Sequence, residues 1–263
     1  MTSARWTAPP QNHAVIGHRS WYGLHGHSLN ANLASLAIAE TLGTSILVLT
    51  IISTAIAAAT DRPVAGVPYG SLAVPLAGGI ALASMVGALG QVSGAHLNPA
   101  VTLGLAVNRR FPWAFVPFYV LAQFAGGIAA ALLAWLLYGD KARTVAHLGA
   151  TYPATGVGAW RTFAAEGILT FALVLVIVSV ALNPKIPTGA AAVAIGLALA
   201  GGILIIGPIT GAGLNPARVM GPMIPSDLYT DWWVYLVAEL LGGVAGVFLY
   251  DRLLHGVIPP ALP

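Results

Sequence analysis

The 263-residue chain carries little charge: 7% of its residues are charged and 57% are hydrophobic, its formal net charge is +3, and its mean hydropathy is +0.83. Because about a quarter of the residues in a soluble domain are charged, a soluble enzyme or binding domain is excluded, and we predict an integral membrane protein in contact with lipid. The chain has no Cys, which excludes disulfides, iron–sulfur clusters and Cys-ligated zinc; we expect no metal and no cofactor, and the small net charge without a basic run argues against a nucleic-acid partner.

The first 32 residues form a polar stretch that contains several His and Gly. The apolar sequence starts near Leu33, which is late for a cleaved leader, and the first run is long enough to cross a bilayer. We therefore interpret residues 1–32 as a cytoplasmic tail and the run after it as a retained helix. Six runs have the roughly 20 apolar residues that a span requires: 33–59, 71–91, 113–138, 160–183, 188–207 and 232–253.

Two nearly identical stretches lie outside these six runs, "SGAHLNPAVT" at 93–102 and "TGAGLNPARV" at 210–219. The apolar sequence after each is too short to span the membrane but long enough for half a helix. Irregular backbone at membrane depth is tolerated only where protein buries it or where it lines a water-filled cavity. The sequence therefore predicts two half-helices, 98–108 and 215–224, that re-enter the membrane.

The two stretches belong to an internal repeat. A shift of 117 residues (215 minus 98) superposes them and places the second span on the fifth, while shifts of 116 and 126 align the third span with the sixth and the first with the fourth. Three spans per repeat is odd, so the second half must enter the membrane from the opposite face. The predicted fold is an all-α membrane bundle of six spans and two half-helices in an inverted 3+3 repeat. Its parts are a first repeat (33–138), a connecting loop (139–159), a second repeat (160–253) and a C-terminal tail (254–263).

Orientation follows from the Lys and Arg residues in the flanks of the spans. An even number of spans places both termini on one side, and with the termini in the cytoplasm that side has the larger number of cations. The cytoplasmic set is Arg5, Arg19, Arg109, Arg110, Lys185 and Arg252, and the opposite set is Arg62, Lys141, Arg143 and Arg161. This small bias predicts cytoplasmic termini.

The repeated motif is Asn98, Pro99 and Ala100 in the first copy and Asn215, Pro216 and Ala217 in the second. Asn is a strong N-cap residue, and Pro fits the first helical position because its missing N–H would have no partner there. If the amide oxygen accepts from the helix's own N–H groups, the NH₂ group remains as a donor. Two such helix N-termini facing each other place donors and positive dipole ends at the centre of a passage, which would bind a neutral solute and oppose a cation or proton.

Arg218 stands where the first copy has Val101. A charge at membrane depth is costly and usually functional. One turn into the half-helix, its guanidinium is expected to reach the passage on the extracytoplasmic side, where it would repel cations and donate to passing oxygens. A side chain that merely extends to the interface is the alternative.

The duplicated motif, the six spans, "GAHLNPAVT", "LNPAR" and the Glu of the first span resemble the aquaporin, or major intrinsic protein, family over about residues 33–253. The resemblance implies an hourglass pore in each subunit, a homotetramer and passive conduction. It also implies a filter of four residues, which falls by ungapped spacing on Gly78, Ile203, Ala212 and Arg218.

These filter residues depart from the family's strict water channels, which have an aromatic at the first position and His at the second. Glycerol-conducting members typically have Asp after the Arg, where this chain has Val219. Gly78 is reminiscent of plant members that pass metalloid hydroxides, although Ile203 departs from them. We therefore expect a wider opening with one apolar wall.

Three further polar residues are candidates for the pore or its support. Glu40 and Glu166 are repeat mates and are expected to accept backbone N–H groups from the re-entrant loops; in a secondary transporter they would instead relay protons. His96, two residues before Asn98, is expected either to line the cytoplasmic vestibule or to pack the loop. Glu239, the mate of Gln123, is expected to be structural. The tail histidines, His13, His18, His25 and His27, are expected to belong to a disordered polar tail, with pH or metal sensitivity as the alternative.

The sequence as a whole predicts a passive channel that conducts water and small uncharged solutes, such as glycerol, urea or metalloid hydroxides, and excludes protons and ions. It would lie in a plasma (inner) membrane. A strict water channel is the first alternative, and a transporter using Glu40 and Glu166 is the second. Without Cys or a Gly-x-Ser-x-Gly elbow the sequence offers no nucleophile for an intramembrane hydrolase, so we do not expect an enzyme.

Overall fold

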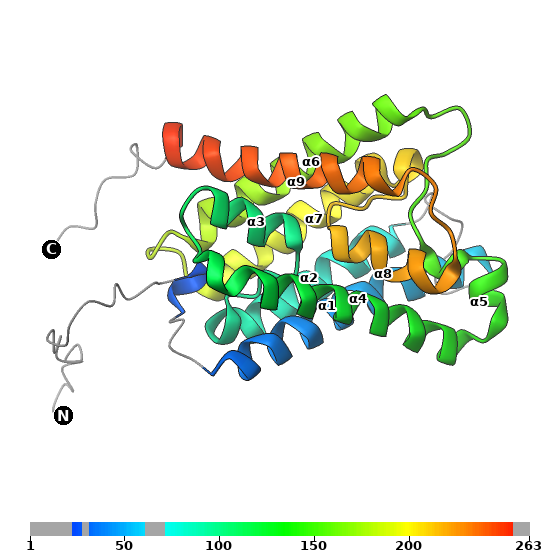
Figure 1. Ribbon diagram of the computed structural model, residues 1–263, viewed down its shortest axis with the longest axis horizontal. Coiled ribbons are helices and arrows are strands. Elements are labelled where there is room, and N and C mark those ends of the chain that lie inside the picture. The colour runs from blue at the N-terminus through cyan, green and yellow to red at the C-terminus, as the bar shows by residue number, and fades with distance from the viewer. Residues whose placement is uncertain (1–22, 28–31, 61–71, 255–263) are drawn as a thin grey trace, which may run out of the picture.

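The computed structural model describes residues 23–27, 32–60 and 72–254, and within them the chain is helical (Figure 1). The main helices are α1 (Leu33–Ala59), α2 (Ala73–Ser93), α3 (Pro99–Val107), α4 (Val116–Tyr138), α5 (Asp140–Thr144), α6 (Ala159–Ala181), α7 (Thr188–Thr210), α8 (Pro216–Ser226) and α9 (Trp232–Leu249). Short turns of 3-10 helix are η1 (Leu24–Gly26), η2 (Trp113–Phe115) and η3 (His147–Gly149), and α9 continues into a π-helical turn, η4 (Tyr250–Leu254).

Six helices of the described chain are long and apolar enough to cross a membrane, which confirms the predicted all-α class and number of spans. When η2 and η4 are counted with the spans that they continue, the expected and observed ends differ by at most three residues. The largest difference is at the fifth span, which runs past Pro208 to Thr210 rather than ending at residue 207. Pro in the last turn is tolerated here because the helix ends just beyond it, at Gly211 with φ of 81°. The segment expected as a loop between the repeats contains α5 and η3.

The two half-helices lie inside the bundle (Figure 1), where α3 packs against α9 and α8 packs against α4. A matched pair of glycines allows this close packing. A Cβ added at Gly243 of α9 would lie 2.5 Å from the carbonyl oxygen of Ala100, and one added at its mate, Gly127 of α4, would collide with the carbonyl of Ala217. Since no side chain fits at either point, α4 and α9 hold the half-helices by backbone contact.

The residue before Gly127 and the residue before Gly243 are also glycines, and each of them faces a membrane span on the other side of its helix. Gly126 packs against the backbone of Thr41 in α1, and its mate Gly242 packs against that of Gly167 in α6. These glycines let neighbouring helices approach closely, as small residues do in lipid. Each Gly-Gly pair joins a span on one side to a half-helix on the other.

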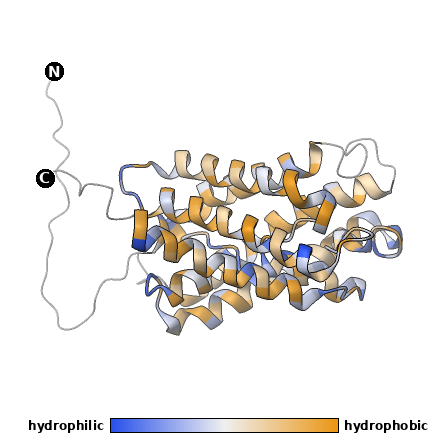
Figure 2. Cartoon of the chain, turned by 90° about the horizontal axis from the view of Figure 1, so that it is seen from above, coloured by the Kyte–Doolittle hydropathy of each residue, from blue (hydrophilic) through white to orange (hydrophobic). Residues whose placement is uncertain are grey.

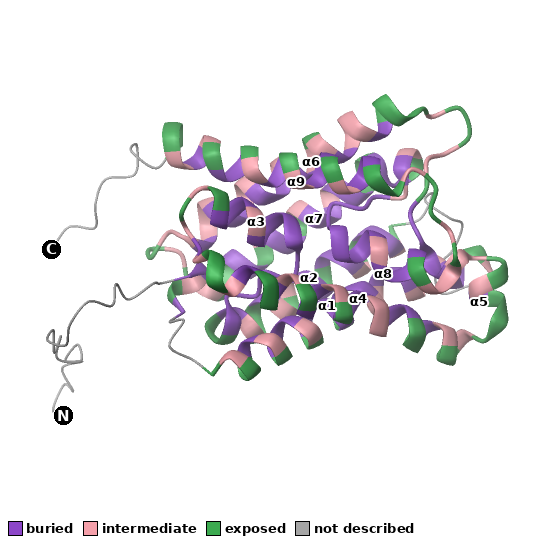
Figure 3. Ribbon diagram, viewed as in Figure 1, coloured by how far each residue is buried: buried purple, intermediate pink, exposed green. Residues whose placement is uncertain are grey.

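The outside of the bundle is apolar. Large side chains such as Leu121, Leu136 and Leu197 are exposed, and Figures 2 and 3 show hydrophobic and exposed residues recurring along the outward faces of the long helices. Exposed apolar surface over most of a bundle suits a lipid environment. The polar residues Glu40, Glu166 and Glu239 are all fully buried instead.

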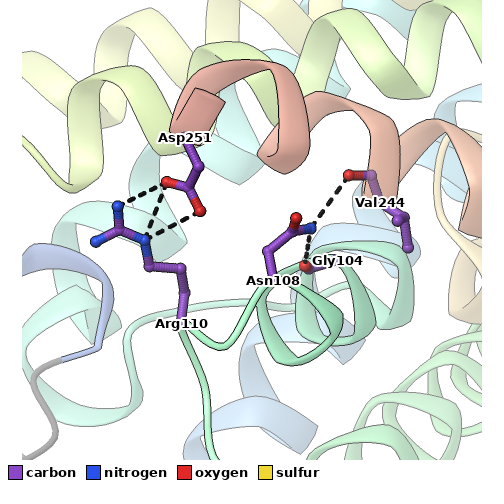
Figure 4. Close-up of polar contacts among 5 residues, drawn as sticks. All are labelled: Gly104, Asn108, Arg110, Val244 and Asp251. Carbon is purple, nitrogen blue, oxygen red and sulfur yellow. Dashed lines mark hydrogen bonds and ion pairs between the residues drawn. The ribbon is translucent and has the colours of Figure 1, made fainter. Parts of the chain in front are cut away.

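The end of α3 is tied to α9 and η4 by polar contacts (Figure 4). Asn108 donates through Nδ2 to the carbonyl oxygens of Gly104 (2.8 Å) and Val244 (3.2 Å). Arg110 binds Asp251 through Nε and Nη2, with Nη2 2.7 Å from Oδ1. These contacts fix the outer end of the half-helix, so that its N-terminus has a defined position inside the bundle.

Candidate functional site

The re-entrant loops that precede the half-helices have the same backbone. The loop after α2 contains Gly94 (φ 85°), Ala95 (46°) and Leu97 (51°), and the loop after α7 contains Gly211 (81°), Ala212 (54°) and Leu214 (53°). Left-handed φ values on residues other than Gly are unfavourable and persist only when the surroundings impose them. The matched pattern shows that both loops are held rigidly in one conformation.

Each loop ends in an Asn that caps its half-helix as expected from the sequence. Asn98 Oδ1 accepts from the backbone N–H of Ala100 (2.8 Å), and Asn215 Oδ1 accepts from those of Ala217 (2.9 Å) and Arg218 (3.4 Å). Pro occupies the first helical turn in both. The N-termini of both helices therefore reach the middle of the bundle with their amides oriented.

The two Asn side chains also join the loops to each other. Asn98 Nδ2 donates to the carbonyl oxygen of Leu214 (2.8 Å), and Asn215 Nδ2 donates to that of Leu97 (2.7 Å). An NH₂ group has two hydrogens. The reciprocal contact uses one hydrogen of each amide, so one remains for a solute, whereas the sequence interpretation assigned the whole NH₂ group to the passage.

A narrow cavity passes between the Asn side chains. Its polar lining comes from His96, Asn98, Asn215 and Arg218 and from the loop residues Leu97, Gly213 and Leu214, and its apolar lining comes from Leu47, Ile51, Leu82, Leu173, Ile177 and Leu199. Its volume is about 20 Å³, little more than the 10–15 Å³ or so that one water requires. The residues predicted to form the centre of a passage thus come together around a small cavity.

Arg218 lies one turn into α8, is 3% exposed, and donates through Nη1 to the carbonyl oxygen of Gly149 (3.0 Å). Val101, at the matching point of α3, is buried in the apolar core. The guanidinium is therefore held at the cavity, where it places a positive charge.

Of the other residues expected to form the filter, Gly78 and Ile203 contact each other, but neither they nor Ala212 is among the residues that line the cavity. A Cβ added at Gly78 would lie 2.7 Å from Cδ1 of Ile203 and 3.2 Å from Cγ1 of Ile51. The space that Gly78 leaves is therefore partly filled by Ile203. Ala212 is 2% exposed and sits in the strained loop before Arg218.

Both predicted carboxylates hold the re-entrant loops. Glu40 accepts from the backbone N–H groups of His96 (3.0 Å) and Leu97 (2.7 Å), and Glu166 accepts from those of Gly213 and Leu214 (both 2.9 Å). The sequence interpretation missed a hydroxyl partner for each: Ser93 donates to Glu40 (2.7 Å) and Thr210 to Glu166 (2.6 Å). The signal was available, because both hydroxyl residues precede the Gly that ends a span.

His96 packs against neighbouring side chains and also borders the cavity. Its Nδ1 lies 3.1 Å from Thr102 Oγ1, and its ring packs 4.8 Å from that of Phe111 and 4.9 Å from that of Tyr119. It also lines the cavity. Its Nε2 is buried and has no hydrogen-bond partner among the described residues.

Part of the N-terminal tail packs against the same end of the bundle, which differs from the expected disordered tail. In η1, Leu24 is 1% exposed, and the carbonyl oxygen of His25 accepts from Nε2 of Gln91 on α2 (3.0 Å). Burial, and secondarily the neighbouring His27, lowers the pKa of His25 from 6.5 to about 4. His13 and His18 lie outside the described residues, and the described part contains no group of three side chains suited to a metal.

Acidification is expected to release η1. The pKa of His25 is lower when η1 is docked than when it is free, so His25 binds a proton more tightly once η1 has left the bundle. Docking is therefore most stable above about pH 6.5, and it is lost as the pH falls toward about 4, the pKa of His25 in the docked state. Hydrogen–deuterium exchange of the backbone amides at 23–27 measures this loss of protection. Burial lowers the pKa of His27 as well, so the double variant His25→Gln with His27→Gln, compared at each pH, removes both titrating groups and corrects for intrinsic exchange. Equal loss in both proteins would contradict the prediction.

Most of the chain is similar to proteins of one known family. The family model described as "Major intrinsic protein" matches residues 28–250. The chain is similar to the "Probable aquaporin AqpM" of Archaeoglobus fulgidus, with 38% identity over 243 residues that cover 86% of this chain and 99% of that protein. It is also similar to "Aquaporin NIP1-4" of Oryza sativa subsp. japonica, with 42% identity over 178 residues, 68% of this chain and 63% of that one. Among solved structures, the aquaglyceroporin from Plasmodium falciparum aligns with a TM-score of 0.77 and 27% identity, covering 86% of this chain and 98% of that one.

Proposed function

Because the chain belongs to the major intrinsic protein family and is an aquaporin-type channel, we propose that it conducts water and small uncharged solutes passively and excludes protons and ions. Glycerol, urea and metalloid hydroxides are the solutes of suitable size and polarity. The observation that carries the proposal is one narrow cavity lined by Asn98, Asn215 and Arg218. These residues offer N–H donors and positive potential, which bind an uncharged oxygen and repel a cation.

The re-entrant helices supply much of this potential. Each helix N-terminus acts as roughly half a positive charge, and both are directed toward the cavity by Asn caps. A proton passing as a cation would meet both N-termini and then Arg218. The carbonyl oxygens of Leu97 and Leu214 are already acceptors for the opposite Asn, so they offer the cation little compensation.

A strict water channel is the second candidate, and one observation favours it. Ile203 occupies part of the space beside Gly78, and the cavity is only about 20 Å³. Similarity to an aquaglyceroporin supports the broader solute range instead. A proton-coupled transporter is disfavoured because Glu40 and Glu166 are both engaged by loop N–H groups and hydroxyls, away from the cavity lining.

We also propose a homotetramer with cytoplasmic termini in a plasma membrane. Support for the orientation comes from the distribution of Lys and Arg, and support for assembly comes from the resemblance to the family. An apolar groove between α2 and α7, lined by Leu76, Ile80, Val193 and Leu197 among others, offers a surface for another copy. Native mass spectrometry in detergent tests the assembly, and protease protection of an N-terminal tag in sealed vesicles tests the orientation.

Proteoliposomes test the function directly. Stopped-flow light scattering is expected to show water permeability well above that of empty vesicles, together with glycerol, urea or boric acid flux. A pyranine-loaded preparation is expected to hold a pH gradient as long as empty vesicles do. Water flux without solute flux would select the strict water channel, and a fast proton leak would reject the proposed exclusion mechanism.

A further inference from the structure

The two halves support their re-entrant loops in the same way except at one point. In the first half, Gln123 of α4 donates through Nε2 to Glu40 Oε2 (2.7 Å) and to Thr102 Oγ1 (3.0 Å). The repeat shift of 116 residues places Glu239 of α9 at the position of Gln123, and the shift of 117 places Val219 at that of Thr102. An amide donor and its hydroxyl neighbour are thus replaced by a carboxyl beside an apolar side chain.

Glu239 lies directly beside Glu166. It is fully buried, and its polar neighbours are the Glu166 carboxyl and the backbone of Asn215. A Cβ added at Gly213 would collide with Glu239 Oε1 and lie 3.2 Å from Glu166 Oε2, so both carboxyls pack on the same loop residue. Gly213 is required here because the Glu239 carboxyl occupies the place of a side chain.

The hydrogen bonds around Glu40, Glu166 and Glu239 indicate which carboxyl carries a proton. Glu166 receives three donors, from Thr210, Gly213 and Leu214, and its mate Glu40 receives a fourth from Gln123. In the described part of the chain, neither oxygen of Glu239 has a partner at hydrogen-bond geometry when the group is treated as an acceptor. Within the described residues, the backbone N–H of Asn215 is the one donor near Glu239. A buried carboxylate with so little support, next to a second carboxylate, is unfavourable, whereas a neutral carboxylic acid carries one O–H donor.

We propose that Glu239 is a neutral carboxylic acid whose O–H donates to Glu166, and that this shared proton positions the second re-entrant loop and the filter that follows it. The charged groups that face Glu239 are Glu166 on α6 and Arg218 on α8. With one proton shared, the negative Glu166 and the positive Arg218 balance. Loss of the proton would add an uncompensated anion behind Asn215.

Glu239 acts in this proposal as a positioning residue. It does not line the cavity, but Glu166, which it supports, holds the N–H groups of Gly213 and Leu214. Those residues lie between Ala212 and the Asn215 cap, from which α8 carries Arg218. Loosening the loop would therefore disturb the filter and the cap together.

Two substitutions at Glu239 distinguish a role for its O–H as a hydrogen-bond donor from a role for its volume alone. Glu239→Gln supplies the amide donor that the first half uses, and it is expected to keep water permeability within about twofold of wild type. Glu239→Leu removes the donor at similar volume and is expected to lower water permeability about tenfold, because Glu166 loses a buried partner. If both variants behave alike, the donor has no role and the proposal is wrong.

A spectroscopic measurement tests the proton without relying on transport. The infrared C=O stretch of a neutral carboxylic acid is expected in the purified wild type at neutral pH, shifted in deuterium oxide and absent in Glu239→Gln. Asp251→Asn, which removes a carboxylate paired with Arg110, should retain the band. Absence of the band in the wild type would overturn the proposal whatever solute the channel conducts.

The Glu166–Glu239 pair predicts that the stability and water permeability of the protein decline at alkaline pH. Raising the pH removes the shared proton, so loop order and water permeability of the wild type should decline, while Glu239→Gln has no proton to lose. Thermal unfolding and water flux, recorded for both proteins from neutral to strongly alkaline pH, measure the difference. Coincident profiles would contradict a titrating group at position 239.

Discussion

Replacing Arg218 with alanine is expected to raise the leak of protons and small cations through the channel by about a hundredfold. A unit charge about 4 Å from a passing cation is worth about 4 kcal/mol at an effective dielectric constant of about 20, and water in the pore screens part of it. The guanidinium stands at the cavity, held by the carbonyl oxygen of Gly149. Its removal leaves only the two helix N-termini to oppose a cation.

Water permeability should change much less than the leak, because Asn98 and Asn215 still supply their donors. Pyranine quenching for protons and stopped-flow scattering for water, measured on the same vesicles, give the two values. Arg161→Ala removes an equal charge from an exposed position at the start of α6, outside the cavity lining, and should leave the leak at the wild-type level. An Arg218→Ala channel that conducts water and still holds the gradient would show that the helix dipoles alone exclude protons.

The fold could be predicted closely because lipid and symmetry restrict it. A span needs a set length of apolar residues, and the repeat relates every helix of one half to a helix of the other. The caps at Asn98 and Asn215 followed from the chemistry of Asn-Pro. Even the loop carboxylates were predictable, because Glu40 and Glu166 are repeat mates beside backbone that has no other partner.

The details that could not be predicted depend on side-chain directions across the repeat. The sequence gives no distance between Gly78 and Ile203, so a Gly at the filter suggested open space that the Ile203 side chain partly fills. Each Asn was expected to turn its whole amide toward the passage, yet one hydrogen is used to join the two loops. Glu239 aligns with the first half of the chain at a shift of 116 residues, and Glu166 aligns with it at a shift of 126. Because the two shifts differ, the sequence does not reveal that these two carboxyls lie side by side in the folded protein.

The docking of the N-terminal tail on the bundle could not be predicted from the sequence either. His25 and His27 lie in a polar sequence that favours disorder, and nothing in their spacing indicates that Leu24 is buried beside α2. Docking depends on the shape of the bundle's end, a property of the whole fold. Such a contact is found only when the helices are already in place.

The double variant Gly78→Phe with Ile203→His is expected to abolish glycerol-sized flux while retaining water flux. These substitutions introduce the aromatic and the His of the family's strict water channels at two positions that contact each other in this chain. In the proposed channel, glycerol would pass Arg218 with its carbon backbone against an apolar wall formed by Ile203, and the double variant would remove that wall and fill the space beside it. Glycerol flux should fall more than about tenfold, since a solute that does not fit pays a steep steric cost.

The order of substitution matters because Ile203 already occupies the space at Gly78. Gly78→Phe alone would collide with Ile203 Cδ1, so the single variant tests packing rather than selectivity. Ile203→Ala provides the opposite control, because it opens the space beside Gly78 and should raise glycerol flux relative to water flux. Swelling assays in water, glycerol and urea on all three proteins measure the ratios. If glycerol flux is unchanged in both the double variant and Ile203→Ala, the selectivity filter lies elsewhere in the pore, and Gly78 and Ile203 serve only to pack α2 against α7.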